Sequence, residues 1–276
     1  MRIALSIFIP KWSKVLSLFR MTMRETTYNS NLAKGCGLID ETLMLLSLYK
    51  EGMTKASLAD YIHQHNSLSK CTEKRSKDIV NLVFYPRFMK NDSRVPTWLK
   101  AIRNRGVMLP QFKQLLMLYC ARENAIMYDY IISRLNEYRI SGNISIKREE
   151  IRRYVDDIVT AGKASWSESI CNKQVSYIKS VLLDFDLVDK RNNILPYNIA
   201  NTTVLYLMHE LHFIGLSDMA IWHHEDWSLY GLDKYQVQEK IMELNLKGGY
   251  IAQCSGELLT ISWNYQTMEE FINGAI

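Results

Sequence analysis

The chain has 276 residues, 47% of them hydrophobic and 23% charged, a length sufficient for two globular domains and a composition that excludes a disordered or fibrous protein. Its five cysteines lie far apart without a C-x-x-C pair, which excludes the usual zinc-finger spacings and argues against a disulfide framework; we expect buried thiols in a cytoplasmic protein. The net charge of +5 is uneven, because residues 70–122 hold 12 Lys and Arg against 3 Asp and Glu, whereas residues 201–276 hold 3 against 10. This polarity predicts two surfaces with different partners.

We interpret residues 1–20 as an N-terminal extension. Its apolar run, residues 3–9, is too short for a bilayer, which takes about 20 residues, and basic residues interrupt any continuation. A weak membrane-surface helix is the alternative, since four apolar side chains fall on one helical face beside lysines: Trp12, Val15, Leu16 and Phe19. We expect the extension to be dispensable for folding, and we expect no stable membrane insertion.

Helical spacing of apolar residues dominates residues 21–141, which we predict to form a basic helical bundle. The third helix should end near Pro86, because proline lacks a backbone N–H and its ring clashes with the preceding turn. The predicted helices are, in chain order, ETLMLLSLY, ASLADYIHQHN, TEKRSKDIVNLVF, TWLKAIRNR and two long apolar patterns between residues 111 and 138.

Residues 142–200 are predicted to form a winged-helix-like module, because two helical patterns are followed by a hairpin pattern. The second helix opens with an S-x-x-E capping box from Ser165 to Glu168. The expected elements are helices over 147–160 and 165–185 and a hairpin in LVDKRNNIL.

Residues 201–276 repeat this outline as an acidic winged-helix-like module. Its negative charge would repel phosphates, so we expect a protein partner for it. The expected elements are helices over 203–214, 218–224 and 234–246 and a hairpin in YIAQCSGELLTISW. The predicted fold class is therefore mainly α, with an N-terminal helical bundle followed by winged-helix-like α+β units that carry short β-hairpins.

The stretch HELHFIGLSDMAIWHHEDW holds four of the six histidines and raises the question of a metallohydrolase. A zincin helix needs two histidines four residues apart with a glutamate between them, so that both imidazoles reach one ion. Here His209 and His212 are three residues apart, and the apolar stripe of the same helix places both at its margin. We predict a structural segment that binds no metal.

Two further stretches resemble catalytic motifs, but the sequence around each does not fit the motif. YVDD, Tyr154 to Asp157, resembles the catalytic turn of reverse transcriptases, but its flanks continue a helical pattern. The run from Gly162 to Ser165 resembles the end of a P-loop without its earlier glycine. Because no G-x-S-x-G or G-x-G-x-x-G motif occurs either, we predict no enzymatic activity and no cofactor.

Residues 70–122 contain the strongest functional signal, an excess of cations interleaved with aromatic residues. Cations bind phosphates, and exposed rings such as Phe84, Tyr85, Phe88 and Trp98 could stack on bases or sugars. The alternative is a solvated helix face over a core that takes the aromatic side chains. We favour nucleic acid, with candidate contacts at Lys74, Arg75, Lys77, Arg87, Lys90, Arg94, Lys100, Arg103, Arg105 and Lys113.

The central module adds three candidate contacts. Lys173 belongs to the outer face of the predicted 165–185 helix, together with Asn172, Ser176 and Ser180. Lys190 and Arg191 belong to the tip of the hairpin that follows. A recognition helix with a phosphate-touching wing has this pattern, as does any exposed helix and turn.

Four stretches of the chain resemble the BrxA family of BREX bacteriophage-exclusion systems, over roughly Tyr28 to the C-terminus. The resemblance implies a non-enzymatic, mostly helical component of phage defence. It also implies binding to double-stranded DNA and partnership with other BREX components, namely a DNA methyltransferase and ATPase subunits. The stretches are YNSNLAKGCGLIDETLMLLSLYKEG, CTEKRSKDIVNLVFYPRF, ASWSESICNKQVSYIKSVLLDFDLVD and GLSDMAIWHHEDWSLYGL with the final hairpin.

These observations together predict a cytoplasmic, α-rich accessory protein that binds duplex DNA largely through its phosphates. A protein-interaction scaffold, in which the basic residues meet an acidic partner, is the rival hypothesis. RNA in place of DNA remains open, since helical bundles bind both.

Overall fold

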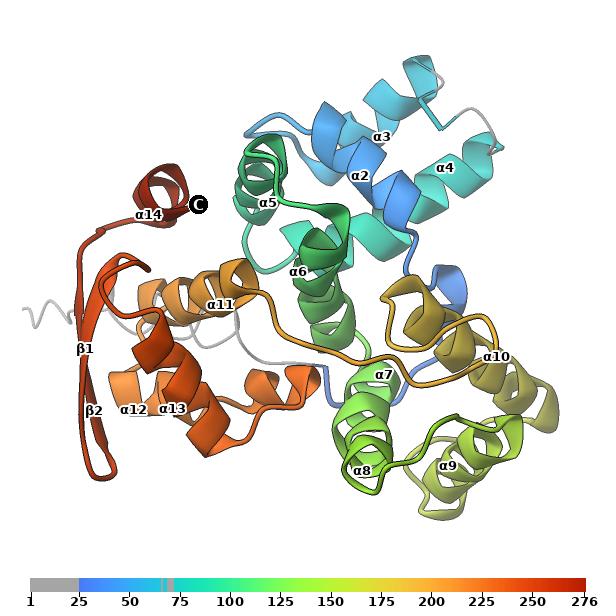
Figure 1. The fold of residues 1–276 in the computed structure, drawn as a ribbon. Helices are drawn as coiled ribbons and strands as arrows, with labels where there is room; N and C mark the ends of the chain where they lie inside the picture. The colour runs from blue at the N-terminus through green and yellow to red at the C-terminus, as the bar shows by residue number, and fades with distance from the viewer. Residues whose placement is uncertain (1–24, 66, 69–71) are drawn as a thin grey trace, which may run out of the picture.

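The computed structural model describes residues 25–65, 67–68 and 72–276 (Figure 1). The prediction for residues 1–20 lies outside this part of the chain. The mainly helical fold is confirmed, with one two-stranded antiparallel sheet near the C-terminus of the described chain. No helix among the described residues has the length and apolar character needed to cross a membrane.

The N-terminal half is built of helices that cross one another around α6 (Figure 1). The four helices predicted first and the two long apolar patterns are all present. The elements are η1 (Asn31–Lys34), α2 (Ile39–Leu48), α3 (Lys55–Gln64), α4 (Glu73–Ile79), η2 (Val80–Met89), α5 (Val95–Asn104), α6 (Leu109–Arg122), α7 (Ala125–Asp129), η3 (Tyr130–Leu135) and α8 (Asn136–Ile140).

The expected helix end near Pro86 is wrong. The helix that begins as α4 continues through Pro86 to Met89 in the wider π form, η2. Lys90 N–H accordingly donates to Tyr85 O, five residues back, at 2.9 Å. A π turn moves the preceding carbonyls away from the proline ring, which relieves the clash that ends an α-helix.

The central unit contains α9 (Arg148–Thr160), α10 (Glu168–Asp184) and a hairpin. Its buried face on α9 is the predicted one, with Ile151, Tyr154, Val155 and Ile158. The predicted capping box is wrong, because Ser167 is the N-cap of α10 and Glu168 lies in its first turn, paired with Arg152.

The hairpin after α10 is tightened by Asp189. Its carboxylate accepts from the backbone N–H groups of Arg191 at 2.7 Å and Asn193 at 2.8 Å, and this lowers its pKa. Isolated antiparallel bridges join Val188 to Ile194 and Ser145 to Asn193, so the two expected strands are reduced to single bridges and the segment before α9 lies against the hairpin. Lys190 and Arg191 consequently stand exposed at the tip, as predicted.

The C-terminal unit follows its predicted order and then adds α14, which was not predicted. In the hairpin, Tyr250 pairs with Trp263 and Ser255 with Leu258. Helix α14 returns to α5, where Trp98 Nε1 donates to Glu269 Oε1 at 2.6 Å. The elements are α11 (Asn201–Phe213), α12 (Asp218–Trp222), η4 (Glu225–Tyr230), α13 (Lys234–Glu243), β1 (Tyr250–Ser255), β2 (Leu258–Trp263) and α14 (Met268–Ala275).

One hydrophobic core extends through the three units, from Leu32 to Ile272. A buried ion cluster joins the first unit to the last, since Arg122 of α6 contacts Glu210 at 2.9 Å and Asp226 at 2.7 Å. Tyr119 also donates to Glu210, at 2.6 Å. The one guanidinium contacts both carboxylates, and hydrogen bonds from Tyr119 to Glu210 and from Tyr128 to Asp226 further stabilise the buried carboxylates.

Candidate nucleic-acid interface

The aromatic residues of the basic segment 70–122 belong mostly to the core. Phe84, Phe88 and Trp98 are buried, so they offer no ring to a base, and the expectation of an exposed stacking surface is wrong for them. Tyr85 is half-buried, with Lys55 Nζ 5.0 Å from its ring centroid. The alternative weighed for these aromatics, a core position, is the observed one.

Arg87 is also part of the interior, with 7% of its surface exposed. Its guanidinium donates to three consecutive backbone carbonyls: Gly35 O at 2.5 Å, Cys36 O at 2.8 Å and Gly37 O at 3.3 Å. A phosphate could not reach these donors, so Arg87 is removed from the candidate contacts. It instead fixes the segment between η1 and α2.

The other candidate cations of this segment mostly have partners within the protein. Four form ion pairs, namely Lys77 with Glu73, Lys90 with Glu123, Arg94 with Asp92 and Lys113 with Asp186. Four donate to neutral oxygens, namely Arg75 to Lys34 O, Lys100 to Ser47 O and Tyr49 O, Arg103 to Val107 O and Arg105 to Asn273 Oδ1. Lys74 is exposed and has no such partner among the described residues.

The central unit has the opposite arrangement, because most of its carboxylates are engaged, with Glu149 the exception among the described residues, and many of its cations have no carboxylate partner. Arg152 pairs with Asp156 of its own helix at 2.8 Å and joins α9 to α10 through Glu168 at 2.7 Å. These hydrogen bonds raise the pKa of Arg152 and lower that of Glu168. Asp157 pairs with Arg134 at 3.3 Å, so the two aspartates of YVDD are held apart on the outside of α9.

Besides Lys163, seven cations of this unit form no ion pair with any described carboxylate. Lys173, Lys190 and Arg191, the three predicted here, are all exposed. The other four were missed, because residues 123–200 have equal numbers of acidic and basic residues and the count conceals which are neutralised. They are Lys147, Arg148, Arg153 and Lys179.

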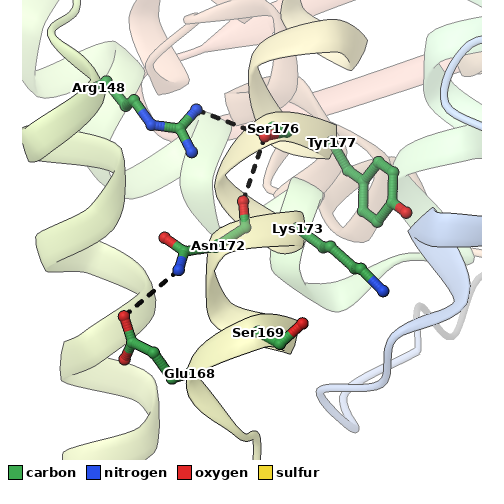
Figure 2. A pocket seen from close by; sticks show the side chains of 7 residues that line it. All are labelled: Arg148, Glu168, Ser169, Asn172, Lys173, Ser176 and Tyr177. Carbon is green, nitrogen blue, oxygen red and sulfur yellow. Dashed lines mark hydrogen bonds between the residues drawn. The ribbon is translucent and has the colours of Figure 1, made fainter.

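A groove of about 740 Å³ runs along the outer face of α10 (Figure 2). Lys173, Ser169 and Asn172 line it from α10, and Arg148 lines it from the first turn of α9. A neighbouring groove of about 380 Å³ shares Arg148 and Asn172 and adds Arg153. Three of the unpaired cations, Lys173, Arg148 and Arg153, therefore line these two grooves, which suits a polyanion more than the dispersed cations of segment 70–122.

The histidine stretch is placed in the C-terminal core. His209 lies not at the margin of its helix but at 0% exposure, where it stacks on Phe271 with 3.7 Å between ring centroids. Its Nδ1 lies 2.9 Å from Leu205 O, and burial lowers its pKa to about 4. The margin prediction is wrong because α14 and β2, which cover this side, were not foreseen as a cover.

The remaining histidines of the stretch face different neighbours. His212 stacks on Trp263 at 4.1 Å and His223 on Trp222 at 4.7 Å, whereas His224 lies beside Asp226 at 3.3 Å. No group of three or more His, Cys, Asp or Glu side chains in the described ranges is arranged to hold a metal ion. The imidazoles serve packing here, and burial lowers the pKa of His212 as well.

The fold and this face define a mainly helical protein with a cation-lined groove. The sequence profile of the BrxA family matches residues 26–210, more than half of the chain. The chain belongs to the BrxA family, and this membership implies a role in BREX phage defence. The family resemblance inferred from the sequence is confirmed over residues 26–210, and the fourth stretch with the final hairpin lies beyond the matched residues.

Two other comparisons complete the picture. A crystal structure of an uncharacterized protein from Magnetospirillum magneticum is similar with a TM-score of 0.55 and 15% identity, over 68% of this chain and 95% of that one. At this identity the similarity shows a shared fold alone. A search of curated proteins found no match to the chain.

Proposed function

We propose that this BrxA-family protein is a non-enzymatic, cytoplasmic accessory factor that binds duplex DNA during BREX defence, mainly through the groove along α10. The observation that carries the proposal is the coincidence of unpaired cations with that groove. Phosphate neutralisation by such cations releases counterions, which supplies most of the affinity for DNA.

A winged-helix-like arrangement of the central unit favours duplex DNA as the ligand. Helix α10 is the second of two crossed helices, and the hairpin behind it presents Lys190 and Arg191. In DNA-binding helix-turn-helix units the second helix enters the major groove, and backbone contacts from neighbouring elements hold it there. Ser169 and Asn172 would then face base edges, while Lys173 and the hairpin tip touch phosphates.

Other BREX components, including methyltransferase and ATPase subunits, belong to the proposal as protein partners. The acidic C-terminal unit supports a protein contact there, because its 10 carboxylate residues against 3 cations disfavour phosphates. Mixing purified components and measuring co-elution by size exclusion tests this part. Co-elution that is lost when the exposed residues Glu239, Glu243 and Glu257 are replaced by Lys would support it, and unchanged elution of every component would refute it.

Gel shifts with one sequence as duplex DNA, single-stranded DNA and duplex RNA test the proposed function. We expect the duplex DNA to bind most tightly, and Lys173→Glu combined with Arg191→Glu to weaken it at least tenfold, since each reversed charge replaces a phosphate contact with a repulsion. Lys234→Glu with Lys240→Glu, in the acidic unit, is the matched control and should bind like the wild type. Stronger binding to RNA, or equal losses in the two variants, would refute the proposal.

A further inference from the structure

The orientation of the Asn172 side chain is determined by its two charged neighbours. Arg152 Nη1 lies 3.0 Å from Oδ1, and Glu168 Oε1 lies 3.3 Å from Nδ2. A guanidinium can only donate and a carboxylate can only accept, so the amide cannot be flipped without breaking both contacts. Asn172 therefore has the second N–H of Nδ2, a donor, and one lone pair of Oδ1 left for a ligand in the groove.

Arg148 is positioned by a similar relay. Ser176 Oγ donates to Asn172 O at 3.2 Å, which commits the hydroxyl hydrogen, and its lone pair accepts from Arg148 Nη1 at 3.4 Å (Figure 2). The guanidinium has five N–H donors, of which this contact uses one. Arg148 is thus held over the groove with donors to spare.

The lining as a whole presents donors to a ligand. Lys173 adds an ammonium group, whereas Glu168 is already bound through both oxygens to Arg152, at 2.7 Å each. In the major groove guanine presents two acceptors, N7 and O6, whereas adenine presents one acceptor beside the N6 amino donor. Asn172 Oδ1 already accepts from Arg152, and the Arg148 and Lys173 side chains can only donate, so the lining matches two acceptors better than an acceptor beside a donor.

We propose that the α10 groove prefers guanine in the major groove, with Asn172 and Arg148 donating to its N7 and O6. This inference rests on the proposed function, since it assumes that α10 enters the groove of a duplex. It makes Asn172 and Arg148 specificity-determining residues and Ser176 a positioning residue that acts through Arg148. The phosphate contacts of Lys190 and Arg191 are independent of it.

Fluorescence anisotropy with substituted duplexes tests the preference. The probes are a G·C-rich duplex, the same duplex with 7-deazaguanine, which lacks the N7 acceptor, and the same duplex with inosine, which lacks only the minor-groove amino group. An A·T-rich duplex of equal length is the fourth probe. We expect 7-deazaguanine and the A·T-rich duplex each to weaken binding about tenfold and inosine to leave it unchanged.

Each outcome bears on one claim. Equal affinity for all four duplexes, or a loss with inosine alone, would overturn the guanine preference while leaving duplex binding intact. No binding to any duplex would overturn the proposed function itself. Tighter binding to the A·T-rich duplex would overturn the donor argument.

Variants at two positions distinguish base recognition from electrostatic attraction to the phosphates. Arg148→Lys keeps the charge and loses the fork of donors, so discrimination against 7-deazaguanine should fall severalfold while the salt dependence stays that of the wild type. Ser176→Ala should lower the same discrimination by releasing Arg148, and Ser176→Thr, which keeps the hydroxyl, should restore it. Unchanged discrimination in Arg148→Lys and Ser176→Ala would show that neither residue determines the preference for guanine.

Discussion

The basic segment 70–122 and the central unit of α9, α10 and their hairpin differ in how their cations are used. The segment carries the larger excess of charge, yet eight of its ten candidate contacts have a partner within the protein and a ninth, Arg87, is buried. The central unit is nearly neutral, but most of its carboxylates are occupied, and the cations Arg148 and Lys173 line a groove. Net charge along a sequence therefore does not identify the surface that a polyanion meets, because pairing in space redistributes it.

The largest expected effect concerns Arg122, a cation of the basic segment with a purely structural set of contacts. Arg122→Ala leaves Glu210 and Asp226 buried without a counter-charge, and we expect the free energy of unfolding to fall by about 3–5 kcal/mol. Urea unfolding followed by circular dichroism measures it. Lys90→Ala, which breaks an exposed pair, is the control and should cost less than about 1 kcal/mol. Comparable losses in the two variants would contradict the distinction between buried and exposed pairs.

His209 is a second example of an ionisable residue whose surroundings in the fold give it a structural role. Its pKa is lowered from 6.5 to about 4, so the unfolded state binds a proton that the folded state excludes between these values. The contribution of His209 to the free energy of unfolding is therefore fully present above pH 6.5. It is lost as the pH falls toward 4, and the loss is on the order of 3 kcal/mol. His209→Phe should lack that part of the pH dependence. Parallel stability curves for the two proteins from pH 7 to pH 4 would show that the imidazole is not buried in its neutral form.

Arg87 gives a smaller effect of the same kind. Arg87→Met retains the apolar stem and removes the donors to the carbonyls of Gly35, Cys36 and Gly37, so we expect a loss of about 2 kcal/mol in unfolding free energy. The salt dependence of DNA binding should stay that of the wild type, because this charge does not face the solvent. A flatter salt dependence with unchanged stability would return Arg87 to the interface.

Local patterns were sufficient for most of the fold. The apolar spacing of α9 and the turn residues around Asp189 predict both elements, because each depends on neighbours within a few residues. The passage of the helix through Pro86 and the return of α14 to Trp98 depend on contacts distant in sequence, so no local pattern indicated them. The cover over His209 was missed for the same reason.

The candidate interface was predictable only in part. Lys173, Lys190 and Arg191 follow from the helix and hairpin patterns, since an outer helix face and a hairpin tip are exposed by construction. Arg148 has no such signal: its place in the groove depends on the packing of α9 against α10 through Arg152. Which cations of segment 70–122 would be paired depended on carboxylates as remote as Glu123 and Asp186.

The salt dependence of duplex binding tests whether the central unit, rather than segment 70–122, contacts the DNA phosphates. Two triple variants remove the same charge, one from the central unit (Lys173→Gln, Lys190→Gln and Arg191→Gln) and one from the basic segment (Lys77→Gln, Lys90→Gln and Arg94→Gln). Each phosphate contact contributes about −0.9 to the slope of log K against log salt. If duplex DNA binds the central unit, we expect the slope to become shallower by about 2 to 3 in the first variant and by less than about 1 in the second. The reverse order would contradict it and place the duplex on segment 70–122.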